Sequence, residues 1–393
     1  MKRFWQAVKE EYTDIFTDSG VMLIFLAGLA IYTMIYPIPY SREVLKELPV
    51  ISLDQDHSSL SRKLLRFIDA TEDVRIAEAS DSLDSARQKI LNAEAYGVVL
   101  IPKGFEQDVL RGRQAMISLH ADACYFLIYR QIYTGVYKAA ATLSAGIEIR
   151  RLSATGLDEK HALRARDPLP MDGRPLFNPA GGYATYVVPP VLILIMQQTL
   201  LIGIGMLGGT RGEENAKPPR SGGRVSILAL LLGRGFVYFS IYILYPVFYL
   251  SMVYHSYALP RQAGIFAVMI FLTPYVLAVI YLGMALNTLF SSRELSIPVL
   301  IFTSMPMVFL IGFAWPLEAI PLWLRNVAQL IPSTPGCAGF IRLNQMGASL
   351  QEVRVEWFSL WGLCIFYFAL AWLSYYRRYR KMPPSAASAT LSP

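Results

Sequence analysis

Residues 21–38 read VMLIFLAGLAIYTMIYPI, an apolar run close to the roughly 20 residues that a helix needs to cross a bilayer. A long polar segment, residues 40–182, follows this run, and a dense series of hydrophobic segments then continues to the C-terminus. A signal peptide is the alternative, but a polar stretch precedes the run and no small-residue cleavage site clearly follows it. The order of segments therefore predicts an uncleaved first span with a large extramembrane domain inserted after it.

The composition agrees with a membrane protein. Hydrophobic residues make up 54% of the chain, charged residues only 17%, and the mean hydropathy is +0.38, which exceeds what a soluble domain buries. Five further spans are expected at residues 185–207, 235–254, 264–290, 297–315 and 357–376. The expected fold is a polytopic α-helical membrane protein with six transmembrane helices and an inserted α/β extracytoplasmic domain. Its parts are a helix at 1–20, the first span at 21–39, the inserted domain at 40–183, the other five spans at 184–376 and a tail at 377–393.

Basic residues in the short loops predict the orientation. They gather before the first span, between the second and third, between the fourth and fifth, and after the last: Lys2, Arg3, Lys9, Arg211, Lys217, Arg220, Arg224, Arg234, Arg293, Arg377, Arg378, Arg380 and Lys381. Both termini are therefore expected in the cytoplasm, and residues 40–183 in the periplasm outside a bacterial inner membrane. This distribution explains the net charge of +7 better than binding of nucleic acid does.

The segment before the first span has helical periodicity. Aromatic and aliphatic residues recur on one face, and charged residues occupy the other: Phe4, Trp5, Val8, Tyr12, Ile15 and Phe16 against Lys9, Glu10, Glu11 and Asp14. The pattern predicts an interfacial helix on the cytoplasmic leaflet, with a helix packed on a partner as the alternative. Asp18 or Ser19 is expected to cap the span that follows.

The insert alternates strand-like with helix-like segments. Strands are expected at 50–53, 74–77, 96–101 and 115–120, and helices at 59–68, 83–92, 105–110 and 125–155. This alternation favours an α/β domain with a small sheet. Residues 158–178 are expected to form a polar connector back to the second span.

Signs of chemistry are weak. Asp54, Asp56 and His57 follow the first strand, and His120 and Asp122 follow the fourth, an arrangement that can bind metal or act as acid and base. Ordinary turn and cap roles explain these residues better. The glycine-rich run at 203–212 lacks the lysine and hydroxyl of a phosphate-binding loop, and close helix packing is the favoured explanation. No catalytic residue, cofactor or metal is therefore expected.

The cysteines indicate neither a disulfide network nor a metal site. Cys124, Cys337 and Cys364 are too few and too scattered for a disulfide network or a metal site. A bridge between Cys124 and Cys337 stays open as an alternative.

Several motifs together resemble those of one family. ISLDQD at 51–56, the segment 58–65, and GVVLIP at 97–102 followed by Phe105 form one set. GFAWP at 312–316, Pro321, Pro332 and Gly347 form another. With the layout of spans, these resemble the permease subunit of type-2 ABC exporters, in the branch with a large external domain after the first helix.

The resemblance implies an exporter of amphipathic or hydrophobic substrates such as drugs or lipids. It implies an ABC ATPase subunit that binds and hydrolyses ATP, a second permease copy or paralogue, and optionally a periplasmic adaptor and an outer-membrane channel. The loop at 208–234 would contact the ATPase, although NAKPPRSGG at 215–223 departs from the usual acidic and threonine pattern. The residues implied in this coupling are Arg211, Glu213, Glu214, Arg224, Arg293 and Glu294.

Other segments leave alternatives open. Residues 225–232 form a coupling or interfacial helix in this interpretation, and Arg234 is a boundary residue that snorkels to the membrane surface. The segment 317–330 either lies at the external interface or packs between spans. Charged residues are nearly absent inside the spans, which argues against an ion-driven transporter. A membrane receptor or assembly scaffold that uses the insert as a docking module is the alternative function.

Overall fold

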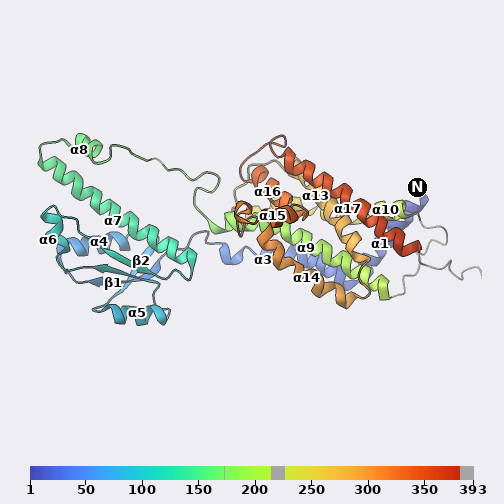
Figure 1. The fold of residues 1–393 in the computed structure, drawn as a ribbon, viewed down its shortest axis with the longest axis horizontal. Coiled ribbons are helices and arrows are strands. Elements are labelled where there is room, and N and C mark those ends of the chain that lie inside the picture. Colours follow the sequence, from blue (N-terminus) through green and yellow to red (C-terminus); the bar gives the residue numbers. More distant parts are fainter. Residues whose placement is uncertain (172, 214–225, 381–393) are drawn as a thin grey trace, which may run out of the picture. The chain divides into compact units, whose positions relative to one another are not determined.

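The computed structural model describes residues 1–171, 173–213 and 226–380. The chain divides into two compact units (Figure 1). Residues 1–43 and 175–393 form one, called here the helical unit, and residues 44–174 form the other, called here the insert unit.

The described part of the helical unit is built from helices. The N-terminal elements are α1 (Lys2–Thr17), α2 (Ser19–Met22), the π-helical η1 (Leu23–Gly28), α3 (Leu29–Ile35) and the 3₁₀ turn η2 (Ile38–Tyr40). After the insert come α9 (Tyr183–Glu213), α10 (Ile227–Tyr242), α11 (Tyr245–Phe248), the π-helical η3 (Tyr249–Val253), α12 (Tyr254–Ser256), α13 (Ile265–Asn287) and α14 (Arg293–Leu310). The last elements are η4 (Leu317–Ala319), α15 (Leu322–Ala328), α16 (Ser333–Asn344) and α17 (Arg354–Arg380).

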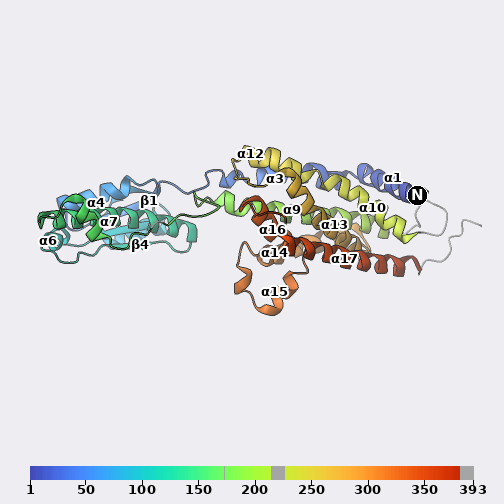
Figure 2. The ribbon, with the colours of Figure 1, turned by 90° about the horizontal axis from the view of Figure 1, so that it is seen from above.

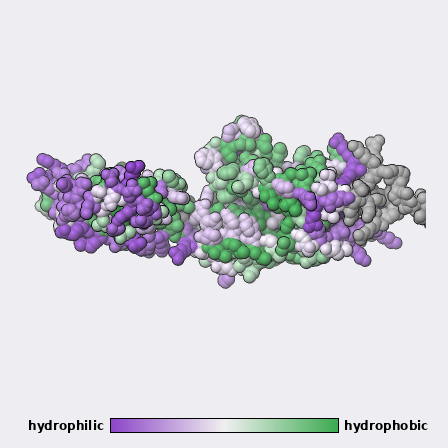
Figure 3. Space-filling view, turned by 90° about the horizontal axis from the view of Figure 1, so that it is seen from below, coloured by the Kyte–Doolittle hydropathy of each residue, from purple (hydrophilic) through white to green (hydrophobic). Residues whose placement is uncertain are grey.

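Six helical stretches in the described residues are long and apolar enough to cross a membrane, as the sequence predicts. They are Ser19–Tyr40, Tyr183–Glu213, Ile227–Ser256, Ile265–Asn287, Arg293–Leu310 and Arg354–Arg378. On the face shown in Figure 3, apolar residues gather over the helical unit, whereas the surface of the insert unit is mostly hydrophilic. The chain is therefore a multi-pass membrane protein.

The helix α9 lies at the centre of the helical unit. Its most apolar stretch is 89% buried, against 11% for α14, and it packs against α13, α14 and α16. The glycines predicted to allow close packing do so here: a Cβ at Gly208 would lie 2.9 Å from the carbonyl oxygen of Asn287, and one at Gly212 would lie 2.7 Å from that of Ser291. A side chain at either position would separate the helices.

Two prolines inside the spans leave carbonyls that other helices satisfy. Pro274 in α13 has no N–H to offer the carbonyl of Ile270, and Trp357 Nε1 of α17 donates to that oxygen at 3.1 Å. Likewise, Pro189 in α9 cannot bond the carbonyl of Thr185, which accepts from Gln345 Nε2 after α16. Such side-chain donors are how apolar spans tolerate proline.

The insert unit contains a mixed sheet. Its described elements are β1 (Leu48–Asp54), α4 (Ser59–Asp69), β2 (Val74–Ala79), α5 (Leu83–Leu91), β3 (Gly97–Ile101), α6 (Phe105–Leu110), β4 (Ser118–Ala121), α7 (Phe126–Ala154) and α8 (Glu159–Arg166). The order is β2-β1-β3-β4, in which β1 is parallel to β2 and β3, and β4 is antiparallel to β3.

Helices cover both faces of this sheet (Figures 1 and 2). Val50 of β1 joins a core with residues of α4, α6 and α7, whereas Ile51 and Leu53 join a second core with Ala86 of α5. The segment expected as a polar connector contains the helix α8, whose Asp158 accepts from the His161 N–H at 2.9 Å as an N-cap.

Candidate functional site

The N-terminal helix α1 packs along α10. Ala7, Val8, Glu11 and Ile15 are buried, and Gly233 of α10 allows the approach, because a Cβ there would lie 2.8 Å from Ala7 Cβ. Glu11, which the sequence places on the charged face of an interfacial helix, is therefore buried against other helices. The polar side of α1 faces other helices, and side chains of those helices bind its carboxylates.

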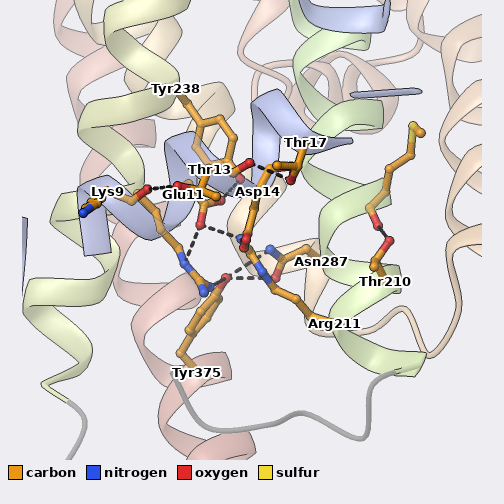
Figure 4. Close-up of polar contacts among 12 residues, drawn as sticks. Lys9, Glu11, Thr13, Asp14, Thr17, Thr210, Arg211, Tyr238, Asn287 and Tyr375 are labelled. Carbon is orange, nitrogen blue, oxygen red and sulfur yellow. Dashed lines mark hydrogen bonds and ion pairs between the residues drawn. The ribbon is translucent and has the colours of Figure 1, made fainter. Parts of the chain in front are cut away.

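Glu11 is the centre of a buried ionic network (Figure 4). Its Oε2 lies 2.6 Å from Arg211 Nη2 of α9 and 2.9 Å from Arg234 Nε of α10, and its Oε1 accepts from the Tyr238 hydroxyl. Arg211 Nη2 also donates to Asp14 at 2.9 Å. One carboxylate from α1 thus connects two membrane-spanning helices.

The network extends to α13 and α17. Arg234 Nη1 donates to the Tyr375 hydroxyl at 3.3 Å, and Asn287 Nδ2 donates to the same oxygen at 3.0 Å. Figure 4 shows Asn287 and Tyr375 beside Arg211. Four of the six spanning helices therefore contribute polar groups around Glu11.

A second ion pair ties the end of α1 to α14. Asp18 caps α2 by accepting from the N–H groups of Gly20 and Val21 at 3.0 and 3.1 Å, as predicted for this residue. The same carboxylate accepts from Arg293 Nη1 and Nη2 at 2.5 and 2.9 Å. Glu213 at the end of α9 accepts from the Arg293 backbone N–H at 2.7 Å. The ends of α1, α9 and α14 are thereby held together.

Electrostatics favours the ionised forms of these acids. Burial raises the pKa of Glu11, but the charges of Arg211 and Arg234 and the hydrogen bonds outweigh it, so the pKa lies below its usual value. For Asp18, burial also raises the pKa, but the hydrogen bonds from Arg293 and from the α2 backbone outweigh it, so the pKa lies below its usual value. Removing one member of such a buried set leaves an uncompensated charge, at a cost of about 3–5 kcal/mol.

The residues implied in coupling have different surroundings. Arg211 belongs to the network around Glu11 and is largely buried, whereas Glu213 and Arg293 contact each other in the second set of contacts. Glu294 follows Arg293 at the start of α14 and is exposed. Glu214 and Arg224 lie outside the described residues, as does Val225.

Arg234 is not a snorkelling boundary residue. The helix α10 begins at Ile227, so Arg234 lies about two turns inside it, buried and paired with Glu11. The separate helix expected at 225–232 is instead, from Ile227 on, the first part of this span. Sequence reasoning missed Glu11, Asp14 and Tyr238 as partners; the signal was two arginines near apolar spans and unmatched acids on α1.

The acidic and histidine cluster of the insert unit has a structural role. Asp54 accepts from the N–H groups of Asp56 and His57 and from the Ser61 hydroxyl at 2.6 Å. Asp56 accepts from the N–H groups of Gly104 and Glu106 at 2.8 and 3.0 Å. Gly104 precedes α6 in a left-handed conformation, φ 82°. These carboxylates therefore fix two turns, as the favoured interpretation predicts.

The residues at the fourth strand and the three cysteines are also candidate sites in the sequence, and the structure gives their surroundings. Asp122 accepts from the Cys124 N–H at 2.9 Å, and His120 pairs with Val98 across the strands. Cys124 is exposed in the insert unit, whereas Cys337 and Cys364 are buried in the helical unit, and all three are free thiols in the structure.

Comparisons with known proteins agree with this architecture. A family model described as ABC-2 family transporter protein matches residues 19–373. The probable multidrug ABC transporter permease YbhR of Escherichia coli K12 is 20% identical over 368 residues, which cover 92% of this chain and 94% of that protein. YbhR of Escherichia coli O157:H7 aligns with the same identity and coverage. The family match extends from the first span into α17, with the insert unit inside it.

Proposed function

Because the chain belongs to the ABC-2 transporter family, we propose that it is the permease subunit of an ATP-driven exporter in the bacterial inner membrane. In this proposal a separate ABC ATPase supplies the energy, a second permease copy or paralogue completes the pathway, and the chain itself hydrolyses no ATP. The substrate is an amphipathic or hydrophobic molecule of the drug or lipid type. The name of the Escherichia coli relative, a multidrug permease, supports this class.

The proposed orientation places α1 and the tail in the cytoplasm and the insert unit in the periplasm. It rests on the basic residues around α1, the end of α9 and the end of α17. In that position the insert unit would receive substrate or dock an adaptor that leads to an outer-membrane channel.

The observation that carries the proposal is the network around Glu11, Asp18, Arg211 and Arg293. These residues join the segment of α1 and Asp18 to three spans, near the end of α9 that precedes residues 214–225 in the sequence. In this proposal, a displacement of α1 or of the end of α9 by an ATPase is passed to α9, α10 and α14 together. We assign direct ATPase contact to Glu213, Glu214, Arg224 and the exposed Glu294, and transmission to Arg211 and Arg293.

Affinity purification of the tagged chain from its native membrane tests the assembly. An ATPase subunit is expected to co-purify, and Glu294→Ala is expected to weaken its retention, because charged contacts at a dock set orientation and specificity. The control is Glu148→Ala, which removes an exposed carboxylate from α7. A complex that contains no ATPase would favour the receptor or scaffold function instead.

Reconstituted vesicles test the transmission. Asp18→Asn and Arg293→Met each break the ion pair, and both are expected to retain the ATPase but to reduce ATP-driven substrate movement per ATP hydrolysed. The double variant should be no worse than either single variant, because the two side chains act as one pair. Additive losses would contradict the assignment.

A further inference from the structure

A cavity lies at the end of the helical unit opposite the α1 network. Its volume is about 360 Å³, within the range of small-molecule sites, and its walls come from the start of α9, the segment after α14, and α16. The helix α9, which is 31 residues long, begins at this cavity and ends near Arg211, so the two sites lie at opposite ends of one helix.

The lining of the cavity is mainly apolar and aromatic. Phe177, Phe313, Leu317 and Ile341 contribute, together with the aromatic ring of Tyr186. The Tyr186 hydroxyl donates to the Phe313 carbonyl, which directs the polar end of this ring to the backbone. The walls therefore suit a ligand with a bulky apolar body.

Most polar lining groups are already used. Gln345 Nε2 donates to the Thr185 carbonyl, and Asn178 exchanges two hydrogen bonds with the backbone of Gly182, at 2.8 and 3.0 Å. Amide and hydroxyl groups committed in this way hold the walls in place and offer little to a ligand.

Glu318 differs from the other lining groups. It is the one carboxylate among the described lining residues, and it makes no hydrogen bond or ion pair with a described residue. It lies exposed in η4, and no lysine, arginine or histidine joins it among the residues described for the lining. An unpaired carboxylate in the lining of an apolar cavity attracts cations. Aromatic rings in the same lining favour cations too, where a ring face meets the charge.

We propose that this cavity binds amphipathic cations, with Glu318 facing the positive charge and the aromatic walls covering the apolar body. The role of the cavity in export rests on the proposed function, and the binding itself does not. In the proposed orientation the cavity lies at the outer end of the spans, where it would hold substrate after passage through the membrane.

The test uses two ions of the same shape and opposite charge, tetraphenylphosphonium and tetraphenylborate. Equilibrium dialysis of the purified full-length chain in a mild detergent, without ATPase, measures the binding of each. Saturable binding of the cation, tighter than that of the anion, is expected. Glu318→Gln should weaken cation binding by up to about fivefold and reduce the preference for the cation, because only the charge is lost.

Two further variants sharpen the result. Asp81→Asn removes one exposed carboxylate of the insert unit and should leave the affinity for the cation unchanged. Ala338→Trp fills the cavity and should weaken binding of both ions, with correct folding checked by size-exclusion profile and melting temperature. Equal affinities for the two ions, an unchanged cation affinity in Glu318→Gln, or no saturable binding would each overturn the proposal. Since no ATP is involved, a failure of ATP-driven export leaves this result unaffected, and the reverse also holds.

Discussion

Glu43 binds Thr185 through both of its carboxylate oxygens, although 142 residues separate the two in sequence. Oε2 accepts from the Thr185 N–H at 3.1 Å, and Oε1 accepts from the Thr185 hydroxyl at 2.7 Å. The Glu43 carbonyl also accepts from the Tyr183 N–H at 2.7 Å. Glu43 is the last residue of the helical unit before the insert, so these bonds close that unit where the insert begins and ends.

This closure predicts that the insert unit can be removed without loss of the helical fold. Replacing residues 46–172 by a short Gly-Ser linker should leave a monodisperse, helical protein in detergent. The bonds of Glu43 already hold the two ends of the helical unit together, so the linker has only to span a short gap. Circular dichroism and size-exclusion chromatography measure this outcome. Adding Glu43→Ala to the shortened chain should lower its melting temperature. Aggregation of the shortened chain without this substitution would contradict the prediction.

The network around Glu11 predicts that a conservative substitution of this residue strongly lowers the stability of the fold. Glu11→Gln keeps the shape of the side chain but leaves Arg234 buried beside a neutral group, at an expected cost of about 3–5 kcal/mol in unfolding free energy. Thermal unfolding in detergent measures the loss. The control is Glu10→Gln on the same helix, where the side chain accepts only from Gln6 at the surface and the effect should be within about 0.5 kcal/mol.

The lowered pKa of Glu11 predicts how this difference depends on pH. A carboxyl group whose pKa is lower in the folded state than its usual 4.5 stabilises the fold above that pH, and the contribution disappears as the pH falls through the folded-state pKa. The gap in melting temperature between the wild type and Glu11→Gln should therefore be constant from pH 7 to about 5. It should narrow in more acidic buffer. A gap that widens on acidification would show that the carboxylate is not the stabilising species.

Pro274 and Trp357 are expected to be energetically coupled. Trp357→Phe removes the donor to the Ile270 carbonyl and should cost about 0.5–1.5 kcal/mol. In a Pro274→Ala background the alanine N–H can bond the same carbonyl, so the cost of Trp357→Phe should fall. A double-mutant cycle on thermal unfolding measures the coupling, and strictly additive losses would contradict this account.

The effect of a Gly→Ala substitution in the spans on stability should depend on how closely other helices approach that glycine. Gly208→Ala places a methyl group against the Asn287 backbone and should cost about 1–3 kcal/mol. Gly362→Ala in α17 is the matched control, because apart from the neighbouring residues and backbone of its own helix, no described heavy atom lies within 4 Å of the added Cβ. The melting temperature of the Gly362→Ala variant should equal that of the wild type or lie slightly above it, since alanine favours the helix.

Much of the fold is predictable from the sequence because two simple periodicities dominate it. Long apolar runs mark the spans, and alternation in the insert marks strands such as Gly97–Ile101 and helices such as Phe105–Leu110 within a few residues. The helix α16 was missed, because Pro335, Gly336 and Gly339 are typical of a loop. In the structure these small residues let α16 pack closely on other helices: a Cβ at Gly336 would lie 2.7 Å from the ring of Tyr275.

The candidate site is predictable only in part. The charges of Arg211 and Arg293 are visible in the sequence, but their partners Glu11 and Asp18 lie 200 and 275 residues away. No local pattern pairs residues at that separation. The amphipathic pattern of α1 was itself misleading, because its charged face contains an acid that is buried against arginines rather than solvated.

The amide of Gln345 has a consequence for movement. Where Pro189 and Pro190 interrupt the internal bonds of α9, the first turn of that helix is secured to α16 by a side chain instead of by its own backbone. Glu43 also holds this turn, so a tilt of the helix at the prolines requires the bonds of Gln345 and Glu43 to be released, without unwinding the helix. Since Thr185 and Gln345 also line the cavity, a tilt of α9 at these prolines would change the shape of the cavity.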